Sequence, residues 1–595
     1  MDYYEPMQYL TRVIALAAAM VASPLLAQVQ QAAQQPVRTT PEPGAQANTR
    51  ATNTMFTARL MYELLLAEFS FQDGDPQSGY RFMLDAARRT GDEALFRRAT
   101  DMAIQSRSGP GALEVARAWR EAHPDSVDAN RYELQVLLAL NRVAETEAPL
   151  RATLAALPKD DREDFLAALP QLYSRASDKT EAAHVVEHAL DNALKDPAQA
   201  AAAWTAIGRL RLQAGDKVGA LAAATLGQDA DPAARWPALL ALQLAASDEP
   251  QAESLVQHYL QSAKPLPEVQ LAYARWLIDE GRLTDAHAQL AAITARDPEF
   301  AEAWLLQGGL YAQQRDDAQA QLALANYMAL LKLKGGADAS EGMDRARLTL
   351  ARIAARRGDY PNAEALLDQI ETPGQALTVA TERAAIRVKQ GHLDDAIAAI
   401  RAAPDDSPRD TRLKLLAEAQ LLRENGRAEQ SYQMLNAELR KEPTDEDLIY
   451  DTAMSAERMG KPDEMEALLR RLIELKPDAY NAMNALGYSL ADRGVRLPEA
   501  KSLIEKAVQL APDNAFIQDS LGWVEFRLGH HAEAERILSE AFRRRPDAEI
   551  AAHLGEVLWV QGQTERARAV WREGYRLDPD NDTLKQTLKR LKVRP

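Results

Sequence analysis

Cysteine is absent from this 595-residue chain, which excludes disulfides and leaves no thiolate for a zinc or redox site. Glycine and proline are also scarce, with 28 and 30 residues that together stay below the roughly 12% of average usage, so tight turns are few. Runs of Val, Ile, Tyr and Thr, which favour strands, are rare, whereas alanine, leucine, glutamate and arginine dominate. These shortages leave an all-α fold as the expectation.

Positive charge is in short supply as well. The formal net charge is −17 and the sequence pI is about 5.2. Proteins that bind nucleic acid or anionic lipid draw phosphate groups to a basic surface, so we expect no nucleic acid among the partners. The last eleven residues, "KQTLKRLKVRP", are locally basic and are interpreted as the polar end of a terminal capping helix.

The only long apolar run lies near the start of the chain, where residues 13–26 read "VIALAAAMVASPLL". A run of 14 residues is too short to cross about 30 Å of hydrocarbon. With Arg12 before it and Ala27 after it, the run predicts a signal peptide over residues 1–27. We therefore expect a periplasmic protein with no transmembrane segment in the mature chain.

Three further expectations concern the residues around this run. Asp2 and Glu5 do not fit the positively charged start of a signal peptide, so a translation start at Met7 is kept as an alternative. Residues 28–55 are rich in Gln, Pro and Thr and are predicted to form a disordered linker, too polar to build a core. No cysteine near residue 28 can accept a lipid, so any association with the outer membrane would pass through partners.

The C-terminal third repeats with a period of about 34 residues. Pro477, Pro512, Pro546 and Pro579 are 35, 34 and 33 residues apart. Two other residue classes keep the same step, namely Leu-Gly pairs and alanines: Leu486-Gly487, Leu521-Gly522, Leu554-Gly555, Ala500, Ala534 and Ala567. A proline at the end of each unit and small residues inside it predict a helix-turn-helix repeat. Glycine costs about 1 kcal/mol in a helix, so we expect Gly522 to offset that cost by letting the two helices of its unit pack closely.

Upstream units carry the same pattern and resemble the tetratricopeptide repeat (TPR). The residues that fit are Trp204, Ile207, Gly208, Ala220, Pro232, Trp304, Gly308, Tyr311 and Ala320. We predict a TPR helix-turn-helix solenoid of about fifteen helix pairs in two arms. The N-terminal arm covers residues 56–333 with degenerate repeats, a Gly-rich interruption covers 334–344, and the C-terminal arm with its capping helix covers 345–595.

No motif in the sequence indicates an enzyme. The chain lacks a Gly-x-Ser-x-Gly elbow, a His-Glu-x-x-His helix and a phosphate-binding loop, and no stretch outside the repeats is long enough for a catalytic domain. We therefore expect no catalytic residue, cofactor, metal or small-molecule substrate. The use of such a stack is to hold other proteins on its concave face.

Repeat geometry selects the residues expected on that face. Trp523 follows the packed Gly522 and should point to the opposite, inner side of its helix, where exposed aromatics beside polar groups suit a peptide. Packing under the next turn of the superhelix stays open as the alternative. The candidates in three successive repeats are Asn481, Asn484, Tyr488, Phe516, Asp519, Trp523, Phe526, Glu549, Glu556 and Trp559.

Both ends of the repeat region resemble one family, and this resemblance is more specific than the repeat pattern itself. The opening "LMYELLLAEFSFQDGDPQSGYRFMLDAARRTGDEALF" and the closing "NALGYSLADRGVRLPEAKSLIEKAVQLAPDNAFIQDSLGWVEF" look like proteobacterial exported TPR proteins. The best understood type in that family is a lipoprotein partner of a carboxyl-terminal processing protease. The resemblance implies a non-enzymatic adaptor that presents cell-wall hydrolases to the protease. A scaffold for envelope assembly or polysaccharide export is the alternative, with other envelope proteins as its partners.

Overall fold

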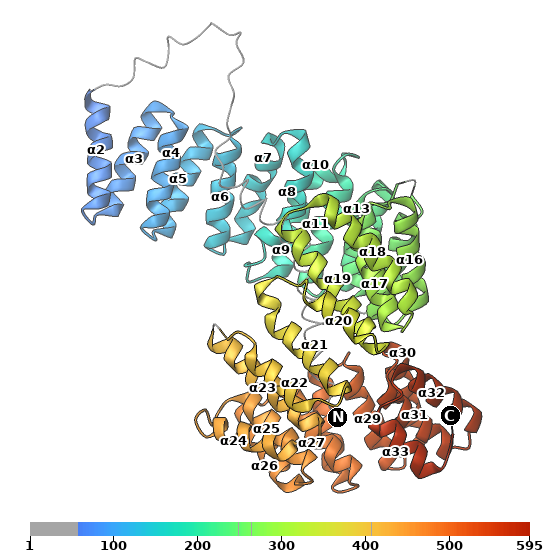
Figure 1. The fold of residues 1–595 in the computed structure, drawn as a ribbon. Coiled ribbons are helices and arrows are strands. Elements are labelled where there is room, and N and C mark those ends of the chain that lie inside the picture. Colours follow the sequence, from blue (N-terminus) through green and yellow to red (C-terminus); the bar gives the residue numbers. More distant parts are fainter. Residues whose placement is uncertain (1–57, 248, 263, 406, 595) are drawn as a thin grey trace. The chain divides into compact units, whose positions relative to one another are not determined.

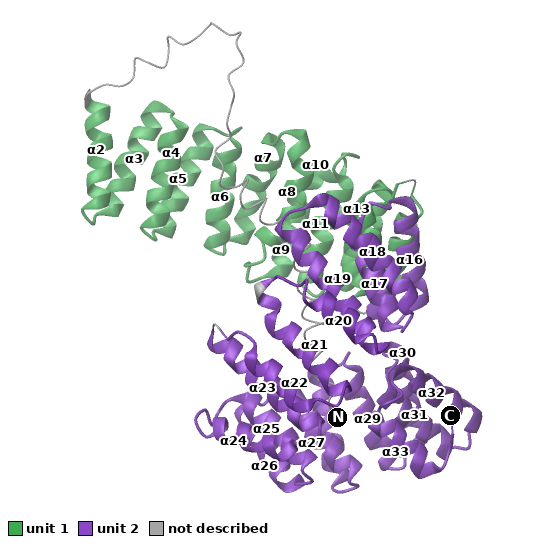
Figure 2. Ribbon diagram, in the orientation of Figure 1, with its two compact units in different colours: residues 1, 3–273 green, residues 2, 274–595 purple. Residues whose placement is uncertain are grey.

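The computed structural model describes residues 58–594, except 248, 263 and 406, and this part is helical without strands. It divides into two compact units, 58–273 and 274–594, and the boundary falls inside one helix (Figures 1 and 2). The all-α fold of packed helix pairs predicted from the sequence is confirmed. The signal peptide over 1–27 and the linker over 28–55 lie outside the described residues.

Unit 1 consists of helix pairs that alternate with less regular turns, coloured blue to green in Figure 1. Its elements are α2 (Ala58–Gln72), α3 (Pro76–Thr90), α4 (Glu93–Gln105), α5 (Gly109–Ala122), α6 (Val127–Ala139), η1 (Val143–Thr146), α7 (Glu147–Ala156), α8 (Lys159–Leu172), α9 (Lys179–Ala189), α10 (Asp191–Leu194), α11 (Ala200–Gln213), α12 (Lys217–Ala230), α13 (Arg235–Ala245), η2 (Pro250–Ala252) and α14 (Glu253–Leu260). The unit boundary lies within α15 (Pro267–Asp279).

Unit 2 holds the more regular repeats. Its elements are α16 (Leu283–Arg296), α17 (Ala301–Gln313), α18 (Asp317–Lys334), α19 (Ala337–Arg356), α20 (Tyr360–Leu367), η3 (Pro373–Gln375), α21 (Ala376–Lys389), α22 (Leu393–Ala402), α23 (Pro408–Glu424), α24 (Ala428–Leu439), α25 (Glu446–Arg458), α26 (Pro462–Leu475), α27 (Tyr480–Asp492), α28 (Leu497–Leu510), α29 (Ala515–Arg527), α30 (His531–Arg544), α31 (Ala548–Val560), α32 (Thr564–Leu577) and α33 (Asp582–Leu591). In its last four repeats the second helix of the pair, α26, α28, α30 or α32, is always 14 residues long.

The glycine of each Leu-Gly pair packs against the second helix of its own repeat. A Cβ atom added to Gly522 on α29 would lie 2.5 Å from Leu538 Cγ on α30, and one added to Gly555 on α31 would lie 2.1 Å from Trp571 Nε1 on α32. No real Cβ atom fits at those distances, so only glycine lets the helices approach this closely. The predicted role of Gly522 is confirmed.

Caps and turns set the ends of these helices. The Asn514 side chain accepts hydrogen bonds from the first amides of α29, and Asp547 does the same for α31. The turn between the paired helices requires a left-handed residue, supplied by Gly529 (φ 89°) and Gly562 (φ 82°). The same cap and the same glycine turn thus recur in these two successive repeats, whereas α27 of the repeat before them begins after Ala479 without a side-chain cap.

The Gly-rich interruption is shorter than predicted. Only Gly335 and Gly336 break the helical pattern, because α19 resumes at Ala337 rather than after residue 344. Packing also continues across the two glycines, since Leu331 of α18 and Ala339 of α19 belong to one hydrophobic cluster. The chain therefore does not divide here, and its two units instead meet between residues 273 and 274.

The C-terminal end of the solenoid is covered by α33. Its Leu584 and Leu588 pack into the cluster that contains Trp571, while basic side chains such as Lys585 stay exposed. One face of the helix thus closes the core and the other faces solvent, as a capping helix does. Across the described residues, none of the helices combines the length and apolar character needed to cross a bilayer.

Segments far apart in the sequence touch within unit 2. Arg543 Nη1, at the end of α30, donates to the Glu280 carbonyl oxygen beyond α15 at 3.1 Å, and Arg576 Nη1, at the end of α32, donates to the Gln314 carbonyl oxygen beyond α17 at 3.0 Å. The partners are 263 and 262 residues apart, about eight repeats. We call these two contacts the arginine clasp. Gly281 is close to it, since an added Cβ would lie 2.7 Å from the Arg543 carbonyl oxygen.

Candidate functional site

Three successive first helices, α27, α29 and α31, bring most of the predicted binding residues together. We call the set the His553 cluster, after the residue at its centre. Its members are Asn481, Asn484 and Tyr488 on α27, Asp519 and Trp523 on α29, and Glu549, His553 and Glu556 on α31. Because they are spaced by three or four residues on each helix, the side chains of one helix share a face.

His553 links the three helices. Its Nδ1 lies 2.9 Å from both carboxylate oxygens of Asp519, and its ring stacks on Trp523 with centroids 4.4 Å apart. Its Nε2 is 3.4 Å from the hydroxyl of Tyr488, two repeats away. These contacts fix the ring on every side, and only 2% of the residue is exposed.

The charge of this histidine follows from its carboxylate neighbours. Burial alone would lower its pKa, but the charge of Asp519 and the hydrogen bond to it, with Glu549 and Glu556 adding to the field, raise the pKa to about 9. His553 is therefore an imidazolium near neutral pH. Burial, followed by the nearby charge of Glu549, raises the pKa of Tyr488 well above its ordinary value, so its hydroxyl stays protonated.

The aromatic side chain at the centre is less exposed than the sequence suggested. We expected Trp523 to be exposed, but the structure shows it 5% exposed, because His553 from the next repeat stacks on it and Phe526 packs 5.3 Å away. The expected exposure is wrong, and the cover comes from the adjacent repeat rather than from the next turn of the superhelix, which was the alternative. The polar neighbours Asn484, Asp519, Glu549 and Glu556 are buried as well.

Several polar atoms of the cluster have no partner. Asn481 Oδ1, Asn484 Oδ1 and Trp523 Nε1 are buried without a hydrogen bond in the described structure. A buried donor or acceptor that stays unpaired costs about 1 to 3 kcal/mol. Three such atoms on adjacent helices therefore indicate a surface that is completed by something else.

The carboxylates of α31 differ in how they are compensated. Arg590 of α33 donates to Glu556, with Nη1 2.7 Å from Oε1. Glu549 has only the Thr583 hydroxyl, 3.4 Å from Oε1, as its recorded partner. Since His553 is matched by Asp519, Glu549 leaves the cluster with one negative charge in excess.

The remaining predicted residues make other contacts. Trp559 packs on Trp571, 5.7 Å between centroids, in the core between α31 and α32. Phe516 lies under the guanidinium of Arg545 at 5.0 Å. These aromatics are half-buried and belong to the frame of the cluster. Their predicted role in partner binding, like that of the cluster, stays a prediction.

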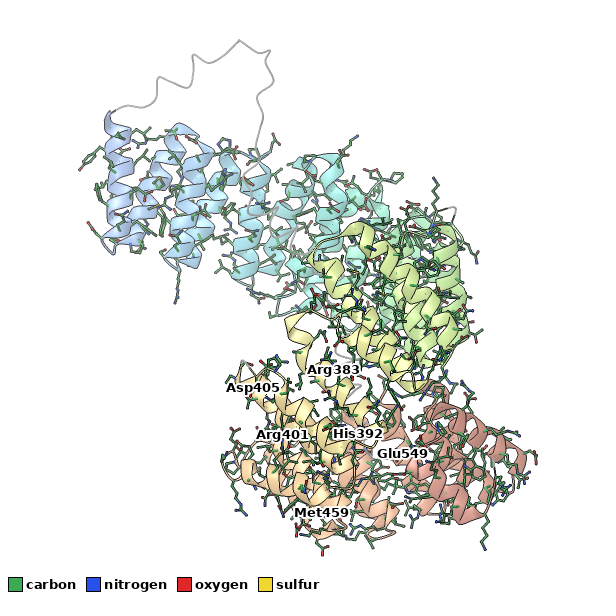
Figure 3. The ribbon with its side chains drawn as sticks, viewed as in Figure 1. Arg383, His392, Arg401, Asp405, Met459 and Glu549 are labelled. Carbon is green, nitrogen blue, oxygen red and sulfur yellow. The ribbon has the colours of Figure 1, made fainter. Side chains whose placement is uncertain are left out.

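A hollow of about 800 Å³ away from the His553 cluster is lined by α20, α21 and α22. Two of these helices, α20 and α22, are short, with 8 and 10 residues. The two arginines that line the hollow already have partners: Arg383 Nε donates to Glu364 Oε2 at 3.0 Å, and Arg387 Nη1 donates to the Asp395 carbonyl oxygen at 3.2 Å. Figure 3 marks Arg383 on α21 and Glu549 on α31. Of these two places, the cluster around Glu549 combines buried charge with unpaired atoms, so it is the stronger candidate.

Among the described residues no group of three or more His, Asp or Glu side chains could hold a metal ion. His553 itself was missed by sequence reasoning. With Gly487, Gly522 and Gly555 in step, His553 aligns with Ser520 and Ala485, a position that elsewhere holds small side chains. The signal available in the sequence was a large histidine, directly after Ala551 and Ala552, at a packing position where the other repeats have a small residue.

The chain matches the family model described as tetratricopeptide repeat over residues 271–330, 450–515 and 520–582. Over 250 residues it is 35% identical to a TPR repeat-containing protein of Pseudomonas aeruginosa, and the match covers 42% of each chain. It is 38% identical to human tetratricopeptide repeat protein 7A over 94 residues, 16% of this chain and 11% of that protein. The chain thus spans less than half the length of these relatives.

Solved structures of repeat proteins are similar over shorter parts. A tetratricopeptide repeat protein from Parabacteroides merdae covers 42% of this chain and 98% of its own, with 17% identity and a TM-score of 0.31. A TPR protein from Thermus thermophilus covers 30% and 99%, with 20% identity and a TM-score of 0.28. These matches place tetratricopeptide repeats in residues 271–330, 450–515 and 520–582, and they make the chain homologous to the Pseudomonas protein over 250 residues.

Proposed function

We propose that this TPR protein is a periplasmic adaptor that binds an extended segment of a partner protein at the His553 cluster. The TPR architecture makes it a protein interaction scaffold. The observation that carries the proposed site is the set of unpaired buried atoms, Asn481 Oδ1, Asn484 Oδ1 and Trp523 Nε1. A main-chain segment supplies N–H donors for the two amide oxygens and a carbonyl acceptor for the indole.

The proposed partners are a carboxyl-terminal processing protease and the cell-wall hydrolases that it degrades. This part rests on the family that the two ends of the repeat region resemble, and the periplasmic location rests on the apolar run over residues 13–26. The homology to the Pseudomonas TPR protein is consistent with it. No catalytic residue is assigned, so the chain would act by bringing protease and substrate together.

Affinity capture from periplasmic extract tests the proposal. Tagged protein beginning at residue 28 should recover a carboxyl-terminal processing protease together with hydrolases. Asn484→Leu should recover much less, because it removes an acceptor from the cluster while leaving the packed residues in place. The exposed Val218→Ala on α12 serves as a control that should bind like the wild type. Recovery of polysaccharide-export proteins without a protease would contradict the adaptor role, and equal capture by Asn484→Leu would contradict the site.

A further inference from the structure

The unmet hydrogen-bonding needs of the His553 cluster describe the group that completes it. Two amide oxygens, on Asn481 and Asn484, are buried acceptors without a donor. The Glu549 carboxylate is 7% exposed, and its recorded hydrogen-bond partner is the Thr583 hydroxyl. The nearby His553 imidazolium is already paired with Asp519. All three needs are for a donor, and one of them is for positive charge.

The repeat geometry places these acceptors in one region. First helices of successive repeats run parallel, and Tyr488 on α27 meets His553 on α31 directly. One helical turn toward the N-terminal end, the same two helices present Asn484 and Glu549, four residues back in each case. The electrostatic effect of Glu549 on both Tyr488 and His553 agrees with this placement. Asn484 and Glu549 therefore border the same space.

An ammonium group matches that space in number and in charge. It carries three N–H donors and no acceptor, so it has one donor for each of the two amide oxygens and one for the carboxylate. A guanidinium, with five donors, would leave two of them unpaired in a buried site. The remaining orphan, Trp523 Nε1, is a donor and needs an acceptor such as a peptide carbonyl. A peptide that carries a primary amine supplies both.

We propose that the His553 cluster selects a polypeptide segment with a primary amine, held by Glu549, Asn484 and Asn481, while a main-chain carbonyl accepts from Trp523 Nε1. This inference rests on the proposed function, since it names the ligand of the same site. The amine comes either from a lysine side chain or from the free N-terminus of a chain. The recognition chemistry is shared, and the probes separate the two sources.

The test uses four fluorescent decapeptides of alanine, glycine and serine, titrated against the full chain from residue 28 by anisotropy. One is blocked at both ends and holds a central lysine, one holds acetyl-lysine instead, one has a free N-terminus and no lysine, and one is blocked without lysine. The lysine peptide or the free N-terminus should bind about tenfold more tightly than its neutral counterpart, the gain expected of a charged hydrogen bond. Whichever amine gives that gain is the source.

Variants connect the preference to the named residues. Glu549→Gln should abolish the preference for the amine, whereas Glu565→Gln, an exposed glutamate on α32, should keep it. The Trp523 indole N–H signal, identified by its loss in Trp523→Phe, should shift on binding in an NMR spectrum.

The outcomes separate the two proposals. If wild type binds all four peptides equally and Asn484→Leu weakens all of them, the peptide site stands and the amine inference is overturned. If the wild type binds none of them and its indole signals do not move, the site itself is overturned. An amine preference that survives Glu549→Gln would also overturn the inference.

Discussion

One buried glutamate from each unit shows two ways of burying a carboxylate. In unit 1, Glu133 on α6 is 2% exposed and is paired with two arginines of α5, Arg117 and Arg120. In unit 2, Glu549 is 7% exposed and is recorded only with the Thr583 hydroxyl. A buried carboxylate is tolerated when cations and hydrogen bonds compensate its desolvation, and is costly otherwise. The first arrangement is what a structural role requires, and the second is what a binding site requires before its ligand arrives.

The units share the device that joins their helices. Gly208 in unit 1 and Gly555 in unit 2 both lie where a Cβ would collide, 2.4 Å from Leu240 Cδ2 and 2.1 Å from Trp571 Nε1. They differ in regularity, since the matches to the TPR family model fall almost entirely in unit 2. Close helix packing is thus common to both, whereas the aligned polar face of α27, α29 and α31 depends on regular repeats.

The shared packing device predicts the largest effects. Gly208→Leu and Gly555→Leu should each destabilise their own unit by about 3 kcal/mol, because the added side chain would overlap the buried Leu240 of α13 in one case and the buried ring of Trp571 in the other. Gly309→Leu is the matched control, as no atom lies within 4 Å of its would-be Cβ. Hydrogen exchange followed by mass spectrometry should show faster exchange in α11 and α31 only. Unchanged protection in either helix would break the claim that both units use one device.

The charge of His553 predicts a pH dependence confined to unit 2. The pKa rises from 6.5 to about 9 on folding, so its stabilisation is complete below about pH 6.5 and is lost as pH rises through 9. The full effect is at most about 3 kcal/mol. Pulse proteolysis in urea at pH 6.5 and 9 should show α31 becoming more susceptible. His553→Gln should remove that difference, and a difference that persists in this variant would assign it to another group.

The two glutamates give the sharpest contrast. Glu133→Gln should destabilise unit 1 by about 2 kcal/mol, since it weakens two charged hydrogen bonds to Arg117 and Arg120. Glu549→Gln should cost unit 2 much less than that, because it removes a buried carboxylate with no recorded arginine or lysine partner, and only its electrostatic support of the His553 imidazolium is lost. Urea midpoints read from peptides of each unit measure both. Equal losses would mean that Glu549 is structural and would remove the basis for the contrast.

The sequence predicted the fold well because one physical requirement repeats. A helix pair that packs closely needs a small residue at a fixed place, so Gly487, Gly522 and Gly555 revealed the period and the pairing together. The sequence showed the two glycines at 335 and 336 that interrupt the helix, but it did not show that α18 and α19 keep packing across them. The unit boundary inside α15 has no turn residue to mark it.

The candidate site was predicted only in part, because its centre depends on contacts between repeats. Asn484, Asp519 and Glu549 were found from their place on the helix face. The burial of Trp523 was not, because it is caused by His553 in the following repeat, where the aligned residues are Ser520 and Ala485. Periodicity identifies what repeats share, and this site is made by a residue that the other repeats lack.

The smallest expected effect concerns the arginine clasp, a contact that distinguishes the two units because it requires a long chain. Its partners are 262 and 263 residues apart, more than the described length of unit 1, so of the two only unit 2 is long enough to meet itself in this way. Each arginine is held by a glutamate three residues earlier, Arg543 by Glu540 and Arg576 by Glu573, and donates to a carbonyl at the end of a helix, where cations are favoured.

Exposed charged contacts contribute under about 1 kcal/mol each, so Arg543→Ala with Arg576→Ala should change global stability little. Loss of the clasp should instead increase the mean separation of α16 and α30. Double electron-electron resonance measures it between spin labels on the exposed Asp285 and Glu533 after substitution by cysteine, which the chain otherwise lacks. Arg536→Ala is the control variant, because Arg536 lies on the same helix α30 but is paired only with Glu533 in the described structure. For this control the second label is moved from Glu533 to Ser539, so that the label does not itself remove the partner of Arg536. A distance distribution that is identical in wild type and the double variant would show that the closure is set by repeat geometry alone.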